Sequence, residues 1–338
     1  MRAVVLDGYR PIAADAIASL RVVEKPVPRP GPGEVLVRMA AAPCNPSDLM
    51  FLQGKYGENR TFPAVPGREG SGTIAAIGGG ILGRFLAGRR VACGRMTDRD
   101  GTWAEFFVAK IRECVLLPRF LGLEQGAASL LNPLTCLGLL AEVREGRHRA
   151  AVQTAASSQV GRMLARLFRR EGIPLVGVVR GPGQVEPALA LGAGPVLCSA
   201  DPDFPESLAR LARDLRATIA FDAVAGGMTG QLLGSMPRGG EVVAYGALSG
   251  DLCSGLAPMD LIAREKRVRG FYLGEWIRDR GPLRAWRAVR RSQRLIAEGV
   301  LRTEIAMRIP IEDVGTGLAA YLARRSEGKA LLTMEGAG

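Results

Sequence analysis

The chain has 338 residues, of which 47% are hydrophobic and 23% charged, and its net charge of +12 is carried mainly by arginine. This composition predicts an ordinary soluble globular protein long enough for two domains, and it excludes a low-complexity chain. Because the arginines are scattered and aromatic residues make up only 5%, no nucleic-acid-binding surface is expected, although the positive charge would attract a phosphorylated cofactor.

Neither a secretory signal nor a membrane span is predicted. The N-terminal apolar run is soon interrupted by Asp7, and the most apolar long window, residues 121–143, is broken by Glu124 and Pro133. The six cysteines show no CxxC spacing. They are therefore predicted to be reduced thiols of a cytoplasmic protein.

Short β-like runs and turns dominate the first 120 residues. An extended proline-rich stretch, residues 26–33, separates some of them. The predicted strands are Ala3–Leu6, Glu34–Ala41, Ser71–Ile77, Arg90–Cys93 and Ala104–Val108. This part of the chain is expected to form a β-rich domain.

The clearest supersecondary pattern lies between residues 150 and 180. A buried strand, Ala150–Gln153, is followed by a turn of small residues that ends at Gly161. An amphipathic helix comes next, and a second apolar run, Leu175–Val179, ends at Arg180. Strand, small-residue turn, helix and strand together predict the first βαβ unit of a dinucleotide-binding domain.

The helix N-terminus explains why small residues are needed in this turn. Its unpaired N–H groups and dipole favour a pyrophosphate if no side chain blocks the approach. The pattern Ala156-x-Ser158-x-x-Gly161 is degenerate, and on this turn alone a βαβ unit without a nucleotide is equally expected.

Arg180 favours a phosphorylated nucleotide. An acidic residue at the tip of the second strand would hold a ribose 2′-hydroxyl, whereas an arginine suits a 2′-phosphate. A solvated arginine at a strand end is the alternative. The placement of Arg180 at the tip of the second strand favours NADP(H) over NAD(H) as the cofactor.

Alternating helices and strands continue beyond this unit, and the tail returns to strand-like runs around a helix from residue 311 to 324. The further predicted elements are strands at Pro195–Cys198, Thr218–Ala223, Glu241–Tyr245, Arg267–Leu273, Ile305–Ile309 and Ala330–Met334, and helices at Pro205–Leu215 and Leu283–Glu298. The predicted fold class is α/β: a β-rich domain made from residues 1–122 and 305–338, with a doubly wound domain, residues 123–304, inserted.

This plan resembles the medium-chain dehydrogenase/reductase superfamily over essentially the whole chain. Shared features are Asn45-Pro46-Ser47-Asp48, the stretch 67–72 and the late nucleotide-binding unit. Several stretches are similar to the 2-enoyl thioester reductases: residues 53–57, 132–135, 270–276 and 328–334. The resemblance implies a GroES-like β-rich catalytic domain and a Rossmann domain.

The residues at the superfamily's metal positions do not suit zinc. Cys44 stands near the first ligand position, but Arg68 replaces the ligand histidine and Asn132 stands near the third position. A guanidinium is always protonated and cannot ligate a metal. The single histidine, His148, precedes the nucleotide strand and is expected at the surface. No metal site is therefore expected.

Without a metal, the superfamily's chemistry is hydride transfer to an activated C=C bond or to a quinone. The resemblance places the family's active-site tyrosine at Tyr56 as proton donor or oxyanion stabiliser. A phenol with an ordinary pKa of about 10 is protonated at pH 7 and can donate to a developing enolate. Without the resemblance, Tyr56 reads as an ordinary aromatic residue of a turn.

The resemblance also implies cofactor contacts. Two departures from the family are noted: Gln159 replaces a glycine, and Tyr272 replaces a tryptophan. Trp276 is a candidate for the acyl pocket, with a core position as the alternative. The implied NADP(H) contacts are Asn132, Ser157, Ser158, Gln159, Val160, Gly161, Arg180, Tyr245, Gly246, Ala247, Leu248, Phe271, Tyr272, Leu273 and Lys329.

The expected function is NADPH-dependent reduction of a 2-enoyl thioester, a small-molecule substrate carried by CoA or a carrier protein. A quinone or enone reductase is the alternative, and a non-catalytic NADPH-binding sensor is the alternative of another class. Because the strand near Arg267 would lie at a sheet edge, a homodimer is expected. Chain length of the acyl group, carrier and pathway stay open.

Overall fold

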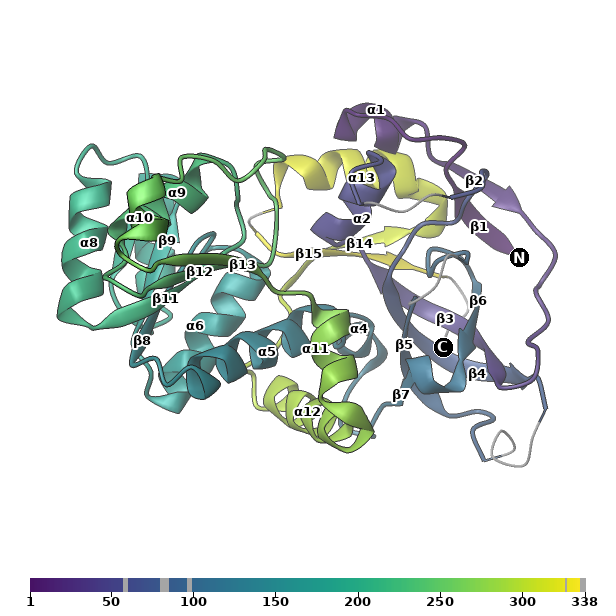
Figure 1. Ribbon diagram of the computed structural model, residues 1–338. Helices are drawn as coiled ribbons and strands as arrows, with labels where there is room; N and C mark the ends of the chain where they lie inside the picture. Colours follow the sequence, from purple (N-terminus) through teal and green to yellow (C-terminus); the bar gives the residue numbers. More distant parts are fainter. Residues whose placement is uncertain (57–59, 80–84, 96–98, 326, 335–338) are drawn as a thin grey trace. The chain divides into compact units, whose positions relative to one another are not determined.

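A computed structural model (Figure 1) describes residues 1–56, 60–79, 85–95, 99–325 and 327–334. The chain divides into two compact units. Both chain ends form the first, Met1–Leu131 with Arg302–Gly338, which we call the terminal unit. The second, Asn132–Leu301, is the central unit. Within the described residues, no helix has the length and apolarity that a membrane crossing requires.

The terminal unit is built on a seven-stranded sheet with the order β14-β15-β3-β4-β5-β7, and β6 pairs with β3. β14 and β15 run parallel and the other pairs are antiparallel. A separate pair, β1 and β2, is antiparallel. The strands of the terminal unit are β1 (Arg2–Val5), β2 (Arg21–Glu24), β3 (Glu34–Pro43), β4 (Glu69–Ile77), β5 (Arg90–Gly94), β6 (Phe106–Lys110), β7 (Cys114–Leu116), β14 (Ile305–Pro310) and β15 (Lys329–Thr333).

Short helices complete this unit, and several of them, α2 and α13 included, share one hydrophobic core with β1, β3 and β15. α2 begins at Pro46, where proline suits the first helical turn, and Asp48 accepts a hydrogen bond from the Asn45 backbone N–H (2.7 Å). The helices are α1 (Ala13–Ala18), α2 (Pro46–Leu52), η1 (Ile111–Glu113), α4 (Leu123–Ala127), η3 (Ile311–Asp313) and α13 (Val314–Ala323).

The central unit is a doubly wound sheet. Its six strands are all parallel, in the order β10-β9-β8-β11-β12-β13. They are β8 (Ala150–Gln153), β9 (Leu175–Val179), β10 (Val196–Cys198), β11 (Ala217–Asp222), β12 (Glu241–Ala244) and β13 (Arg267–Gly270). Every residue of β8 and β9 is buried, as expected for strands covered on both faces.

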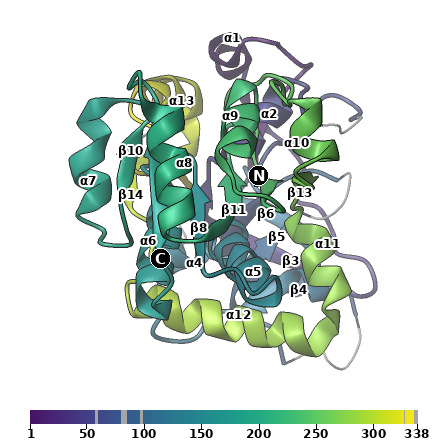
Figure 2. The same ribbon diagram turned by 60° about the vertical axis from the view of Figure 1, so that its left-hand side comes forward.

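Helices cover both faces of this sheet. α8 and α9 lie side by side on one face, where their apolar residues share a core with alternate residues of β8 and β9 (Figure 2). α6 and α7 pack on the other face. The helices are α5 (Leu131–Glu145), α6 (Gln159–Glu171), η2 (Pro182–Gln184), α7 (Val185–Leu189), α8 (Phe204–Asp214), α9 (Gly227–Ser235), α10 (Pro258–Ile262), α11 (Leu273–Asp279) and α12 (Gly281–Ala297).

The predicted fold class is confirmed: a β-rich part from both chain ends and an inserted doubly wound part. The expected domain boundaries along the chain were 122/123 and 304/305, whereas the two compact units divide at 131/132 and 301/302. The first difference arises because α4 packs on β3, β4 and β5, so this segment joins the terminal unit.

Three sequence expectations need correction. The strand expected over Arg267–Leu273 ends at Gly270, and the chain turns into α11 at Leu273. The strand expected at Ala104–Val108 lies at Phe106–Lys110, because Ala104 instead bridges to Ala3. His148 is not a surface residue, since its side chain is 12% exposed and contacts Thr218 and Glu241.

Candidate functional site

The turn after β8 forms a close-packed cradle. Ser158 caps α6 by accepting a hydrogen bond from Gly161 N–H (3.1 Å). A Cβ atom added to Gly161 would lie 2.4 Å from the Ala155 carbonyl oxygen, so a side chain there would displace the turn. The 13-residue helix α6 therefore begins against a turn of small residues, which is the arrangement that favours an anion at its N-terminus.

Arg180 lies where the sequence placed it, directly after β9, and its side chain is exposed. Its backbone N–H donates to Gln184 Oε1 (3.2 Å), and Gln184 Nε2 donates to Ser157 Oγ (3.0 Å). Gln184 thus ties the strand tip to the small-residue turn. The Arg180 guanidinium takes no part in this link.

Gln159, the bulky departure from the family pattern, is the first residue of α6 and is only 9% exposed. Its side chain is therefore largely inside the unit and does not stand exposed on the turn. Next to it, Val160 is half-buried. Because Gln159 is buried, small residues still form the surface of the turn.

Two further segments lie at the carboxyl edge of the same sheet. Residues 245–248 follow β12 and residues 271–273 follow β13, and the carboxyl ends of parallel strands meet at one edge. Tyr245 N–H donates to the Asp222 carbonyl (2.9 Å), and Leu248 N–H to the Ala223 carbonyl (3.0 Å). The predicted cofactor contacts at Gly246 and Ala247 lie between these two hydrogen bonds.

The segment from Phe271 to Trp276 packs within the central unit. A Cβ atom at Gly138 of α5 would lie 2.3 Å from the Phe271 ring, so the ring fits against a bare helix backbone. The Phe271 and Trp276 ring centroids are 6.5 Å apart, and the Arg280 guanidinium lies 4.6 Å from the Trp276 centroid. Tyr272 is exposed. The substrate-pocket role of Trp276 stays a prediction.

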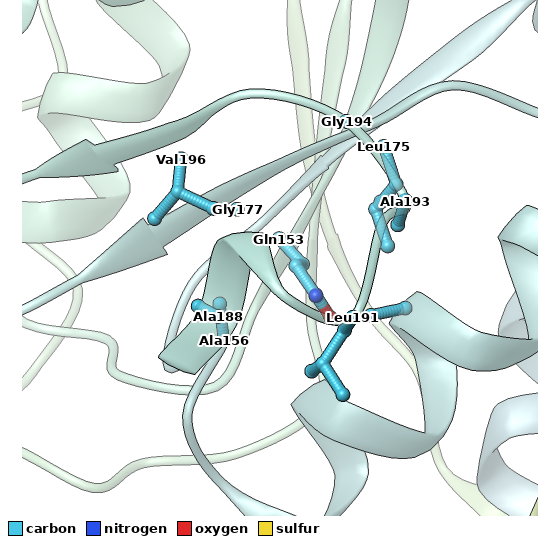
Figure 3. A pocket seen from close by; sticks show the side chains of 10 residues that line it. Gln153, Ala156, Leu175, Gly177, Ala188, Leu191, Ala193, Gly194 and Val196 are labelled. Atoms are coloured by element: carbon cyan, nitrogen blue, oxygen red, sulfur yellow. The ribbon is translucent and has the colours of Figure 1, made fainter. Parts of the chain in front are cut away.

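A small pocket lies beside the turn, with about 220 Å³ of empty space. The Gln153 side chain runs from β8 toward Leu191 in this pocket (Figure 3). Gln153 Nε2 donates to the Gly161 carbonyl (3.1 Å), which holds the strand to the first turn of α6. Much of this space is open to solvent, and the part that a water-sized sphere can enter holds about one water molecule, so the pocket is too small for a dinucleotide.

The terminal unit contains a buried polar network. Lys329, 2% exposed, donates from Nζ to Asn45 Oδ1 (2.8 Å). Asn45 Nδ2 donates to Glu69 Oε1 (3.0 Å). The other Glu69 oxygen accepts from the backbone N–H groups of Leu130 (3.1 Å) and Leu131 (3.0 Å). The structure therefore shows the Lys329 ammonium bound to Asn45, and its cofactor contact stays a prediction.

Burial dominates the acid–base properties of this network. It raises the pKa of Glu69 to about 7, against the opposing effects of Leu131 N–H, the Asn45 amide and the Lys329 charge. Burial also lowers the pKa of Lys329, which the nearby Glu69 carboxylate opposes. Lys329 and Glu69 thus each favour the charged form of the other, and removal of either would leave a buried charge without its counter-ion.

Asp48 provides a test of this electrostatic balance. It is fully buried, and burial raises its pKa to about 6, opposed first by the Asn45 N–H and then by the charges of Arg68, Lys329 and Arg95. A folded-state pKa above the ordinary value of about 3.9 means that ionisation costs stability as the pH rises from about 4 to about 6. Among the described atoms, Asp48 Oδ1 has no hydrogen-bond partner.

Asp48→Asn should therefore unfold at a higher temperature than the parent at pH 8, and the difference should shrink or reverse at pH 4.5. The effect is at most about 3 kcal/mol, and about 1 kcal/mol corresponds to about 2–4 °C in a domain of this size. Thermal unfolding of both proteins at the two pH values measures it. A difference independent of pH would contradict the assigned shift.

Tyr56 lies after α2 and packs, half-buried, against the core of the terminal unit. The guanidinium carbon of Arg68 lies 3.5 Å from the centroid of its ring. Arg68 itself is 9% exposed. Gly57, which follows in the stretch used for the resemblance, lies outside the described residues.

These residues do not fit a zinc ion. Cys44 is 1% exposed, and burial raises its thiol pKa well above the ordinary value, which disfavours the thiolate that zinc needs. Arg68, in place of the ligand histidine, stacks on Tyr56. Over the described ranges, no three His, Cys, Asp or Glu side chains are grouped as metal ligands. Asn132, in α5 of the central unit, keeps its predicted role at the nicotinamide ribose as a prediction.

Sequence reasoning missed two groups of residues. Gln184 was assigned no role, because its contacts come from Ser157 and the backbone of Arg180, and nothing in a Pro-Gly-Gln turn indicates them. Asn45 and Glu69 belong to the stretches that carried the resemblance, yet their link to Lys329 was not foreseen. A polar side chain within a segment expected to be buried indicates that it has a hydrogen-bond partner, and this was the signal available for Asn45 and Glu69.

Two known families match the chain. Residues 31–119 match the alcohol dehydrogenase GroES-like domain, and residues 160–289 match the family described as zinc-binding dehydrogenase. The first match lies in the terminal unit and the second in the central unit.

Relatives and solved structures point to reductases. The mitochondrial enoyl-[acyl-carrier-protein] reductase of Bos taurus is 28% identical over 309 residues, which cover 90% of this chain and 82% of the relative. A Mesorhizobium loti protein provisionally named NADPH:quinone reductase is 31% identical, with a TM-score of 0.92 and 98% of each chain covered. The Escherichia coli quinone oxidoreductase complexed with NADPH is 22% identical, with a TM-score of 0.84 and coverage of 98% and 100%, which shows the fold alone.

Proposed function

Since the chain belongs to the medium-chain dehydrogenase/reductase superfamily of oxidoreductases, we propose that it reduces the C=C bond of a 2-enoyl thioester with NADPH. The observation that carries the proposal is Tyr56, a phenol whose ring lies against the buried guanidinium of Arg68. The residues at the superfamily's metal positions do not suit zinc. The mitochondrial enoyl-[acyl-carrier-protein] reductases at 26–28% identity over most of the chain support this substrate class.

The cofactor part of the proposal rests on the central unit. The cradle at Gly161 and the N-terminus of α6 suit a pyrophosphate, and the exposed Arg180 suits a 2′-phosphate. The backbone after β12 and β13 would bind the carboxamide end. NADPH, when bound, supplies the hydride that reduces the substrate.

The chain's own residues handle the charge and the proton. Once the β-carbon of the enoyl thioester is reduced, negative charge collects on the thioester oxygen. Tyr56 donates a hydrogen bond to this charge or gives its proton to the α-carbon. Unlike a zinc ion, a phenol can do both without a permanent charge at the site.

A quinone or enone reductase is the second candidate, favoured by the 31% identity to the Mesorhizobium loti protein. A nucleotide-binding sensor without catalysis is the third. NADPH oxidation measured side by side with crotonyl-CoA, a longer enoyl-CoA and a quinone separates them. We expect kcat/KM for an enoyl-CoA to exceed that for the quinone. The reverse order supports the second candidate, and NADPH binding without turnover of any substrate supports the third.

Activity should not depend on a metal. Because Arg68 cannot ligate zinc and the thiol form of Cys44 is favoured, purified protein should contain zinc well below one atom per chain. Incubation with a chelator should leave NADPH oxidation unchanged. Atomic absorption together with an activity assay checks this. One zinc per chain, removed together with the activity, would contradict the proposal.

A homodimer formed through the central unit is also expected. β13 is an edge strand of the six-stranded sheet, and the nearby helix α10 exposes Met259 (60%) and Ile262 (74%). An exposed edge with apolar neighbours is suited to pairing with a second copy. Light scattering at micromolar concentration should give about twice the chain mass. In a matched pair of variants, Ile262→Asp should weaken the dimer and Ile12→Asp, at an exposed apolar site of the terminal unit, should not.

A cytoplasmic location and a small-molecule acyl thioester substrate complete the proposal. The six cysteines are all unpaired in the structure, in keeping with a reducing compartment.

A further inference from the structure

Arg68 makes a contact that its sequence position does not explain. Its guanidinium carbon is 3.5 Å from the centroid of the Tyr56 ring, well inside the distance of about 6 Å at which a cation interacts with an aromatic face. At this separation the planar group rests directly on the ring. Only 9% of Arg68 is exposed, so water screens the contact weakly.

The backbone on both sides of Arg68 is fixed. Its carbonyl accepts a hydrogen bond from Arg95 N–H (2.7 Å). The next residue, Glu69, is fully buried and is held by Asn45 and by the N–H groups of Leu130 and Leu131. The fixed backbone sets where the Arg68 side chain begins, and its burial limits the rotamers open to it, so Arg68 can hold Tyr56 in one orientation.

Charged groups of both signs lie in the buried network beside Arg68. Lys329 faces Glu69 through Asn45, and Arg68 and Arg95 act on the buried Asp48 carboxyl. A cation in this setting favours negative charge on the group it covers. The group it covers is the phenol that the proposed function uses as a proton donor.

We propose that Arg68 is a positioning residue that acts through Tyr56, holding the phenol ring and stabilising the negative charge left on its oxygen during proton transfer. In this step the O–H bond of Tyr56 breaks and a C–H bond forms at the α-carbon of the reduced thioester. The electron pair of the enolate makes the new bond, and the phenolate then takes up one proton from the bulk solvent, whose buffer acids supply it at pH 7. The inference rests on the proposed function.

A double-mutant cycle tests it. Arg68→Gln removes the charge and should lower the turnover number about tenfold or more, with KM for the enoyl-CoA changed by less than about threefold. In the Tyr56→Phe background, where no proton can be given, the same substitution should change turnover by less than about twofold. Arg68→Lys keeps a charge without the planar stack and should recover part of the loss.

Arg95→Gln is the matched control. Arg95 is also buried (7% exposed) and lies 5.3 Å from the centroid of Phe51, a ring without a hydroxyl group. Its substitution should cost stability comparable to that of Arg68→Gln and leave turnover within about twofold. Thermal unfolding of every variant separates loss of folding from loss of activity, and Arg68→Lys serves if Arg68→Gln does not fold.

Two failures can be told apart. If Tyr56→Phe slows turnover but Arg68→Gln is equally harmful with and without the phenol, Arg68 acts independently of Tyr56 and this inference is wrong. If Tyr56→Phe itself leaves turnover unchanged, the proposed function loses its proton donor, and the inference falls with it.

Discussion

Tyr56→Phe should lower the turnover number by about 10²–10⁴-fold while leaving the NADPH dissociation constant nearly unchanged. The substitution keeps the ring, its packing on the core and its contact with Arg68, and it deletes only the hydroxyl. A hydroxyl that stabilises charge present only after reduction of the β-carbon contributes to the transition state and not to ground-state binding. Steady-state kinetics with an enoyl-CoA and fluorescence titration with NADPH measure the two quantities.

Tyr9→Phe is the matched control for this experiment. Tyr9 lies in the same unit, with its ring edge-on to Phe51 and Phe62, and has no assigned role in the reaction. Its substitution should leave turnover within about twofold. If Tyr56→Phe behaves in the same way, Tyr56 is an ordinary aromatic residue of a turn, and the reductase proposal needs another proton donor.

Arg180→Ala should raise the apparent dissociation constant for NADPH about tenfold or more and leave that for NADH nearly unchanged. A charge-assisted hydrogen bond from the guanidinium to a 2′-phosphate contributes about 1.5–3 kcal/mol, and NADH has no such phosphate. The backbone N–H of Arg180 would still bind Gln184, so the strand tip and the turn at Ser157 should keep their arrangement. Titration with each cofactor measures the change.

Arg213→Ala is a suitable control. Arg213 is an exposed arginine in the last turn of α8, and its substitution removes the same charge from the same unit. It should change the NADPH constant by less than about twofold, which separates a specific contact from the general positive field. Equal losses for NADPH and NADH in Arg180→Ala would contradict the assignment of Arg180 to the 2′-phosphate.

Much of the fold could be predicted from local patterns. The strand Ala150–Gln153 and the run Leu175–Val179 have the same bounds in the structure, because continuous apolar segments bounded by turns leave little choice of element. The end of β13 could not be predicted in this way. Phe271 is as apolar as a strand residue, but its ring fits against Gly138, 133 residues earlier in the chain, and the backbone leaves the sheet there.

The sequence by itself determined the two-part architecture, the position of Arg180 at a strand tip and the unsuitability of Arg68 as a metal ligand, since these follow from periodicity and side-chain chemistry. Only the tertiary structure decided what Arg68 does instead, that Gln184 joins the turn to the strand tip, and that Lys329 binds Asn45 across 284 residues of sequence. The physical reason is range: hydrophobic periodicity acts within one element, whereas a buried polar group takes the partner that packing brings to it.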